Sequence, residues 1–154
     1  MALEQLIESQ GIRGRIIQLS VPTPTVETAA EAVGTTVDRI VKSLLFIIEG
    51  QPILVITPGT KRVDHKKIAQ RFGVSRKRVK LADPQTVLAV TGYEVGAVPP
   101  FGHHQRLTVI LEESIFQQEL VYAGGGSIKA LLEIDPQEIL RVTGASVLNL
   151  QIDL

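Results

Sequence analysis

The chain has 154 residues, of which 44% are hydrophobic and only 4% aromatic, and its formal net charge at pH 7 is zero. This length suits one domain, residues 1–154, with a core of aliphatic side chains. The absence of cysteine excludes disulfides, thiolate metal sites and cysteine nucleophiles, and it is typical of a cytoplasmic protein. No stretch approaches the roughly 18 apolar residues that a membrane span requires, and residues 1–10 favour a short amphipathic helix over a signal peptide.

Apolar spacing and turn residues predict an irregular alternation of helices and strands along the chain. Helices are expected at 2–10, 23–34, 63–73, 83–92, 114–118 and 135–144, with helical turns near 35–39 and 74–78. Strands are expected at 13–20, 106–113, 120–125, 128–134 and 146–152, with a short strand after 78 and a β-hairpin at 43–59 around Glu49-Gly50-Gln51. This order predicts the α/β class with α+β character, in which a mixed sheet is flanked by helices and is not doubly wound.

Residues that favour helix ends support several of these helices. Thr25 is a candidate cap before the helix that Gly34 ends. Asp83-Pro84 and Asp135-Pro136 each place a capping carboxylate before a proline in the first turn, and Gly92 ends the first of these two helices.

The run from Ile40 to Phe46 is typical of an interior strand, except for one charged residue, Lys42. An ammonium group is costly to desolvate unless it is paired or has a function. Two interpretations follow. Lys42 is either an edge-strand lysine that blocks aggregation between strands, or a functional group that faces a cleft.

The basic residues are strongly clustered although the net charge is zero. Residues 61–80 contain nine of the sixteen lysines and arginines and one acid, Asp64, which gives this window a charge of about +8. Two solvated helix faces would explain these charges. A surface that binds a polyanion, with RNA or DNA phosphate as the first candidate, explains them as well.

The usual catalytic and metal-binding motifs are absent from the sequence. There is no G-x-S-x-G elbow, and His65, His103 and His104 have no convincing serine partner. The adjacent pair His103-His104 lacks a carboxylate at metal-ligand spacing. The stretch AGGGS lacks the Gly-Lys-Ser/Thr ending of a P-loop. What remains is a lone strand lysine, two glycine-bearing loops and a basic patch.

The segments TAAEAVG, DRIVKSLLF, KKIAQRFG, TGYEVGAVPPFG and AGGG, in this order, resemble the YbaK/ProX-type aminoacyl-tRNA deacylases, which are relatives of the editing domain of bacterial prolyl-tRNA synthetases. The resemblance extends from about residue 13 to 145, and IVKSL and TGYEVGAVPPFG are its most specific parts. It implies a single compact domain with a curved mixed sheet, and an enzyme that hydrolyses the ester of a mischarged tRNA. The implied substrate carries a small amino acid, with tRNA-Pro the first candidate. No cofactor and no metal are implied, and prolyl-tRNA synthetase is a second candidate partner beside the tRNA acceptor end.

The resemblance also implies roles for individual residues. The family's lysine falls on Lys42, the expected catalytic residue, whose charge would hold the ester end or terminal phosphate and favour the oxyanion. The expected substrate-binding residues are Thr28, Ser43, Gly92, Gly96, Gly102, His103 and Gly125. The residues expected to contact tRNA are Lys61, Arg62, Lys66, Lys67, Arg76, Lys77 and Arg78. Many relatives have two glycines and Ser-Pro where this chain has Gly96-Ala97 and Pro99-Pro100, a departure that concerns the amino acid accepted and not the reaction class.

Most of these assignments have a structural alternative. Gly92 is expected to end a helix whatever else it does, while Gly96 and Gly102 would serve equally as turn residues. His103 would serve as a solvent-facing loop residue, and helix packing explains Thr28. Two other functions compete with the enzyme: a non-catalytic module that binds tRNA or a nucleotide, and a protein that docks on a synthetase.

Overall fold

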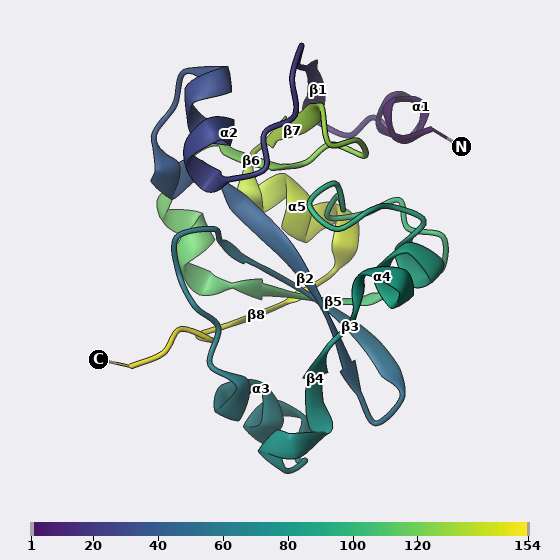
Figure 1. The fold of residues 1–154 in the computed structure, drawn as a ribbon, viewed down its shortest axis with the longest axis vertical. Coiled ribbons are helices and arrows are strands. Elements are labelled where there is room, and N and C mark those ends of the chain that lie inside the picture. Colours follow the sequence, from purple (N-terminus) through teal and green to yellow (C-terminus); the bar gives the residue numbers. More distant parts are fainter. Residues whose placement is uncertain (1, 154) are drawn as a thin grey trace.

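Five α-helices and eight strands alternate along residues 2–153, the part of the chain that the computed structural model describes (Figure 1). Met1 and Leu154, the end residues of the expected domain, lie outside it. The α-helices are α1 (Leu3–Ser9), α2 (Val26–Val33), α3 (His65–Phe72), α4 (Pro84–Thr91) and α5 (Pro136–Thr143). The strands are β1 (Gly14–Gln18), β2 (Val41–Ile48), β3 (Gln51–Pro58), β4 (Val79–Leu81), β5 (Thr108–Glu112), β6 (Val121–Gly124), β7 (Ala130–Ile134) and β8 (Ser146–Leu148). Three short 3₁₀-helices are η1 (Val37–Arg39), η2 (Arg76–Arg78) and η3 (Glu113–Gln117).

The larger sheet is mixed and has the strand order β4-β2-β3-β5-β8. β2 and β3 form the expected antiparallel hairpin, and their turn consists of Glu49 and Gly50, both with positive φ, while Gln51 already belongs to β3. β5 and β8 add to β3 in parallel. The expected α/β class with a mixed sheet is therefore confirmed.

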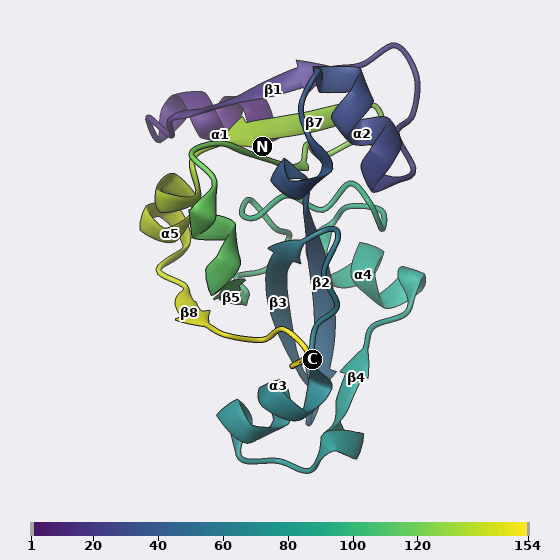
Figure 2. The same cartoon turned by 90° about the vertical axis from the view of Figure 1, so that its left-hand side faces the viewer.

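A second, antiparallel sheet of order β1-β7-β6 crosses the end of the first. Figure 2 shows β1 and β7 running across the view while β2 and β3 run down it. A single bridge between Ile40 and Tyr122 joins the two sheets just before β2 begins. The expected single curved sheet is thus built as two sheets with a junction, and Lys42 lies two residues beyond that junction.

The helix ends are set by the residues that the sequence marked. The Thr25 side chain accepts a hydrogen bond from the backbone N–H of Thr28 at 3.1 Å, and Gly34 ends α2 in the left-handed conformation. Asp83 caps α4 in the same way, and Gly92 ends it with φ of 83°. These caps act within a few residues, so α2 and α4 form where the sequence predicts them, and the expected helices are confirmed.

The expected strand at 146–152 is shorter in the structure. Only Ser146–Leu148 pairs with β5, whereas Gln151 forms an isolated antiparallel bridge with Val63. The chain therefore leaves the sheet after Leu148 and crosses to the segment before α3, which a sequence pattern of alternating apolar residues cannot distinguish from a continuing strand.

Side chains of the larger sheet fill a different core on each face. Along β2, Val41 and Leu45 belong to the main core, which α4 and α5 cover. Phe46 and Ile48 point to the other face and pack against α3. Since side chains alternate between faces along a strand, Lys42 shares the α3 face with Phe46.

A buried carboxylate fixes α5 to the segment before β1. Glu138 has a side chain that is 0% exposed, and it accepts hydrogen bonds from the Arg13 backbone N–H at 2.7 Å and from the guanidinium of Arg141 at 2.7 Å. The Arg141 hydrogen bonds, followed by that of the Arg13 backbone, hold the pKa of Glu138 well below its usual range.

Glu138→Gln is expected to lower the free energy of unfolding by about 2 kcal/mol near neutral pH, because charge-assisted hydrogen bonds are lost. The folded-state pKa lies below the ordinary value of 4.5, so the carboxylate's contribution is complete above that value and disappears as the pH falls. Urea unfolding near pH 7 and near pH 3 should therefore show a smaller difference between wild type and variant at the acidic pH. Glu119→Gln, at an exposed position, is the control, and a difference that is independent of pH would contradict this account.

Candidate functional site

Lys42 lies on a stretch of β2 whose ladder partner is β3 alone. It pairs with Thr57 of β3, and β4 covers only residues 46–48 of β2. Its side chain is half-buried and lines a cavity of about 470 Å³. Within residues 2–153 its ammonium has no hydrogen bond or ion pair. An unpaired strand edge is therefore present, but a lysine that only prevented aggregation would not need to be placed in a cavity.

The Lys42 cavity is lined by apolar side chains and by cations. Three alternating residues of β2, Lys42, Leu44 and Phe46, line it, and successive members lie about 6.8 Å apart along the strand. The remaining lining residues come from the segment before α3, from η2 and β4, and from the end of the described chain: Arg62, Val63, Asp64, His65, Lys66, Arg76, Leu81 and Ile152. The lining thus contains four lysines and arginines and one acid, Asp64. The Asp64 carboxylate already caps α3, since it accepts a hydrogen bond from the backbone N–H of Lys66 at 2.9 Å. Such a cavity attracts an anion.

Burial and neighbouring charges change the protonation of two groups in this cavity. Burial lowers the pKa of Lys42, and the nearby Arg62 lowers it further. Burial also lowers the pKa of His65, with Arg76 adding to the effect and Asp64 opposing it. The His65 ring lies edge-on to Phe46 with ring centroids 5.1 Å apart. A lowered pKa leaves the imidazole mainly uncharged at neutral pH.

The seven basic residues expected to contact tRNA fall into three groups. Arg62, Lys66 and Arg76 line the Lys42 cavity. The outer residues Lys61, Lys77 and Arg78 are exposed, and Arg78 lies 3.8 Å from Glu49 in a surface ion pair.

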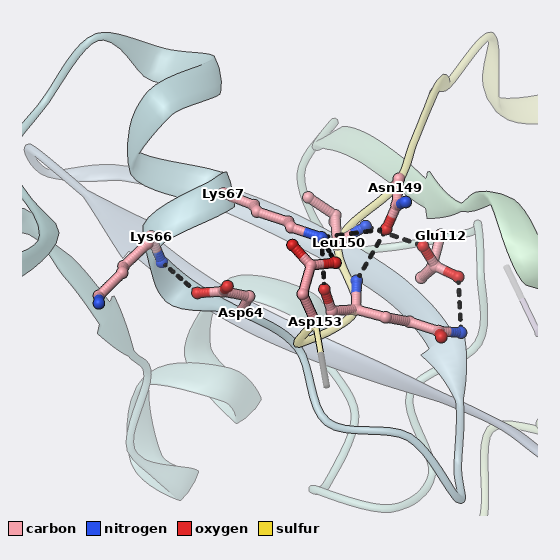
Figure 3. Close-up of polar contacts among 8 residues, drawn as sticks. Asp64, Lys66, Lys67, Glu112, Asn149, Leu150 and Asp153 are labelled. Atoms are coloured by element: carbon pink, nitrogen blue, oxygen red, sulfur yellow. Dashed lines mark hydrogen bonds and ion pairs between the residues drawn. The ribbon is translucent and has the colours of Figure 1, made fainter.

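Lys67 forms the third group by itself. Its ammonium donates to the Gln151 carbonyl at 2.6 Å and to Asp153 Oδ1 at 2.9 Å. Figure 3 shows the side chains of Lys66 and Lys67 leaving α3 in opposite directions, so neighbouring lysines have different surroundings.

Four of the expected substrate-binding residues line a second, larger cavity. Gly92, Gly102, His103 and Gly125 meet in a space of about 860 Å³ beside the first turn of α1, hereafter the glycine-loop cavity. Burial lowers the pKa of His103, and the bond with the Pro99 carbonyl opposes this effect. The ring nitrogen Nε2 lies 2.7 Å from the Pro99 carbonyl oxygen, which can only accept, so Nε2 carries the proton and Nδ1 is left as an acceptor.

The two glycine-bearing loops pack backbone against backbone. A Cβ at Gly124 would lie 2.3 Å from the Val98 carbonyl oxygen of the loop between α4 and β5, whereas one at Gly125 would lie 2.7 Å from Ala130 C, within its own β6–β7 hairpin. The Gly126 N–H also donates to the Ala97 carbonyl at 2.9 Å. The sequence marked both loops by their glycines, but it gave no sign that Gly124 is the contact between them.

The remaining expected substrate-binding residues lie outside both cavities, and no residue between 2 and 153 lines both. Thr28 is exposed and completes the cap of α2. Ser43 points to the face of β2 opposite Lys42, and its hydroxyl is buried without a hydrogen bond, as is that of Thr57. Gly96 adopts a φ of 89° in the loop between α4 and β5. The site residues expected from the sequence are therefore divided between two cavities, with Lys42 in the smaller one.

Two searches of residues 2–153 gave negative results. No group of three or more His, Asp or Glu side chains is placed to hold a metal ion. No helix in this range is long and apolar enough to cross a membrane.

Arg62→Gln is expected to raise the pKa of Lys42, because it removes a neighbouring positive charge, but not to its ordinary value, because burial remains the larger cause. Titration of the lysine ¹³Cε resonances by NMR measures this change. Arg106→Gln, an exposed arginine outside the Lys42 cavity, should leave the pKa of Lys42 unchanged. Equal changes of the Lys42 pKa in both variants would show that Arg62 has no specific local effect on Lys42.

The sequence of this chain is similar to those of several proteins that contain or are related to an aminoacyl-tRNA editing domain. Residues 20–142 match the model of the aminoacyl-tRNA editing domain. The uncharacterised protein YwhH of Bacillus subtilis is 36% identical over 125 residues, which cover 80% of this chain and 78% of that protein. The multifunctional Ser/Thr-tRNA deacylase ProXp-y of Escherichia coli K12 is 26% identical over 129 residues, covering 80% and 75%. A proline–tRNA ligase of Nitratidesulfovibrio vulgaris is 34% identical over 87 residues, which are 54% of this chain and only 15% of the ligase.

Solved structures agree with the sequence matches. The crystal structure of a protein proposed to be a trans-editing enzyme for prolyl tRNA synthetase superposes with a TM-score of 0.90 at 34% identity, covering 98% of this chain and 95% of the other. The protein APE2540 gives the same TM-score at 32% identity, covering 97% and 99%. The resemblance seen in the sequence motifs is confirmed, and the chain belongs to the aminoacyl-tRNA editing domain family.

Proposed function

We propose that the chain is a trans-acting aminoacyl-tRNA deacylase in which Lys42 is the essential residue. The observation that carries this proposal is a half-buried ammonium that has no counter-ion within residues 2–153, inside a cationic cavity of an editing-family protein. Two similar proteins, one named a Ser/Thr-tRNA deacylase and one described as a proposed trans-editing enzyme, support the reaction class.

The reaction needs little more than a positioned charge. Water, or a hydroxyl of the substrate, attacks the ester carbonyl and gives a tetrahedral intermediate with a negative oxygen. When this intermediate collapses, the bond to the ribose oxygen breaks and the ribose oxygen takes the proton of the attacking group. If water attacked, the products are the free amino acid and the uncharged tRNA. If a substrate hydroxyl attacked, the acyl group is now esterified to that hydroxyl, and water must hydrolyse this new ester to release the amino acid. The Lys42 ammonium stabilises the oxyanion or holds the adjacent phosphate, and no protein nucleophile is required because the ester is already activated.

The tRNA acceptor end is the partner whose charge suits this surface. Arg62, Lys66 and Arg76 surround the same cavity as Lys42 and would contact phosphates close to the reacting ester. The exposed Lys61, Lys77 and Arg78 would act at longer range as an electrostatic guide. Lys67 is already hydrogen-bonded within the chain, so it is not among the contacts proposed here.

The glycine-loop cavity would bind another part of the same acceptor end. Backbone N–H groups near Gly92, Gly102 and Gly125, together with His103, would supply its polar contacts. Selection by size would admit a small amino acid and exclude a larger one, and such pockets separate neighbours in size about 10- to 200-fold. The similar segment of proline–tRNA ligases makes tRNA-Pro the first substrate to test, with prolyl-tRNA synthetase as a partner.

Lys42→Ala is expected to reduce deacylation of alanyl-tRNA-Pro at least about 100-fold, as for the loss of an oxyanion-stabilising group, while binding of uncharged tRNA changes little. Lys42→Arg, which keeps the charge, should retain more activity than Lys42→Ala. Single-turnover deacylation and filter binding measure the two effects.

A wild-type protein that binds tRNA but deacylates no member of a panel of mischarged tRNAs would be a binding module. Co-purification with a synthetase and no RNA affinity at low salt would indicate a docking protein.

Lys66→Gln and Lys80→Gln form a matched pair for the RNA contacts. Each removes one exposed charge from the basic window 61–80, but only Lys66 lines the Lys42 cavity. We expect Lys66→Gln to reduce the slope of log affinity against log salt by about one, whereas Lys80→Gln leaves the slope unchanged. Equal slopes for the two variants would contradict the proposed division of the patch.

A further inference from the structure

The segment 149–153 crosses from β8 to α3 and is held by a buried carboxylate. Glu112, the last residue of β5, is only 1% exposed. One of its oxygens accepts the backbone N–H of Leu150 at 2.8 Å, and the other accepts the N–H of Ser114 at 2.9 Å and the side-chain amide of Gln151 at 3.1 Å. These donors are neutral, and within residues 2–153 Glu112 has no ion-pair partner. The cost of burying the carboxylate is thus offset by three hydrogen bonds, two of which come from segment 149–153.

Lys67 holds the same segment from the opposite side. Its ammonium donates to the Gln151 carbonyl at 2.6 Å, to Asp153 at 2.9 Å and to the Asn149 side chain at 3.4 Å. Figure 3 shows these groups converging on the lysine from one stretch of chain. Three acceptors match the three donors of an ammonium group. The segment is therefore fixed both to the end of β5 and to α3.

The held segment supports the wall of the Lys42 cavity. The Asp64 N–H donates to the Leu150 carbonyl at 2.7 Å, and the Ile152 N–H donates to the Arg62 carbonyl at 3.4 Å. Leu150 is 1% exposed in the core beneath α3, and the Ile152 side chain itself lines the cavity. Arg62 and Asp64 are therefore placed by the backbone of segment 149–153.

We propose that residues 149–153 form a strap that positions the cationic wall of the Lys42 cavity, with Glu112 and Lys67 as the positioning residues that hold the strap. The matched family domain ends at residue 142, so the strap lies beyond it. The strap's effect on the cavity stands on the contacts alone, and only its effect on catalysis rests on the proposed function.

Glu112→Gln and Lys67→Met test the proposal without substrate. A glutamine at 112 has one acceptor oxygen and an amide that faces backbone donors, so at least one of the bonds to the strap or to Ser114 is lost. Glu113→Gln, the exposed neighbour, and Lys129→Met, an exposed lysine remote in sequence, carry the same charge changes as controls. Because Lys67 is not fully buried and one of its partners, Asp153, is exposed, Lys67→Met tests the strap even if Glu112→Gln fails to fold.

The first readout is amide hydrogen exchange. In Glu112→Gln and Lys67→Met, the amides of Asp64 and Leu150 should exchange at least about tenfold faster than in wild type, while those of Leu54 and Val55 in the core keep their rates. The second readout is the NMR-determined pKa of Lys42, which should rise as Arg62 moves away from it. Unchanged exchange and an unchanged pKa, or equal acceleration of all amides, would overturn the proposal.

The activity measurement separates this proposal from the proposed function. If wild type deacylates mischarged tRNA, both strap variants should show a raised KM with a smaller change in kcat, because the wall that binds the acceptor end is displaced. A kcat/KM equal to that of the controls, despite faster exchange at Asp64, would overturn the catalytic role of the strap. If wild type shows no deacylation, the proposed function fails, and the exchange and pKa measurements still decide whether the strap holds the cavity wall.

Discussion

The alternation of side chains along β2 is the constraint on which the site depends. It sends Val41 and Leu45 into the main core and leaves Lys42 on the α3 face with Leu44 and Phe46. An ammonium in the main core would need a counter-ion, whereas on the α3 face it stays half-exposed and has no partner among the residues that the structure describes. A shift of one residue in the register with β3 would turn Lys42 toward the main core and turn Val41 and Leu45 away from it. The β2–β3 hairpin therefore fixes the side from which Lys42 acts.

The basic patch is one feature in the sequence but three environments in the structure. Arg62, Lys66 and Arg76 face the same cavity as Lys42, so their charges act together on whatever anion enters. Lys67 is one residue away from Lys66, yet its charge is used within the chain. Cations that surround one cavity also disfavour one another, as the effect of Arg62 on the pKa of Lys42 shows. A bound phosphate would relieve this repulsion between the cations, so the cavity is suited to reversible binding of an anion.

The contact between the two glycine-bearing loops gives the glycine-loop cavity its shape. Gly124 lets the β6–β7 turn approach the loop between α4 and β5 at a distance that no Cβ permits, and Gly125 lets the turn fold closely against the start of β7. Gly92 both ends α4 and lines this cavity, so the helix cap and the cavity wall are the same residue. The first turn of α1 closes the opposite side. The cavity is thus an assembly of chain segments that are far apart in sequence.

The sequence by itself determined the elements and the family. Caps such as Asp83 and Asp135, turn glycines and apolar spacing act over a few residues, so the helices and the β2–β3 hairpin could be predicted. Motifs around Lys42 and the glycine loops are sufficient to indicate the editing family from the sequence. The tertiary structure alone decided that Lys42 and Gly125 line separate cavities, that Lys67 holds the strap, and that the last expected strand ends at Leu148. The reason is physical: these outcomes depend on hydrogen bonds such as that between Lys67 and Gln151, 84 residues apart, which no local pattern encodes.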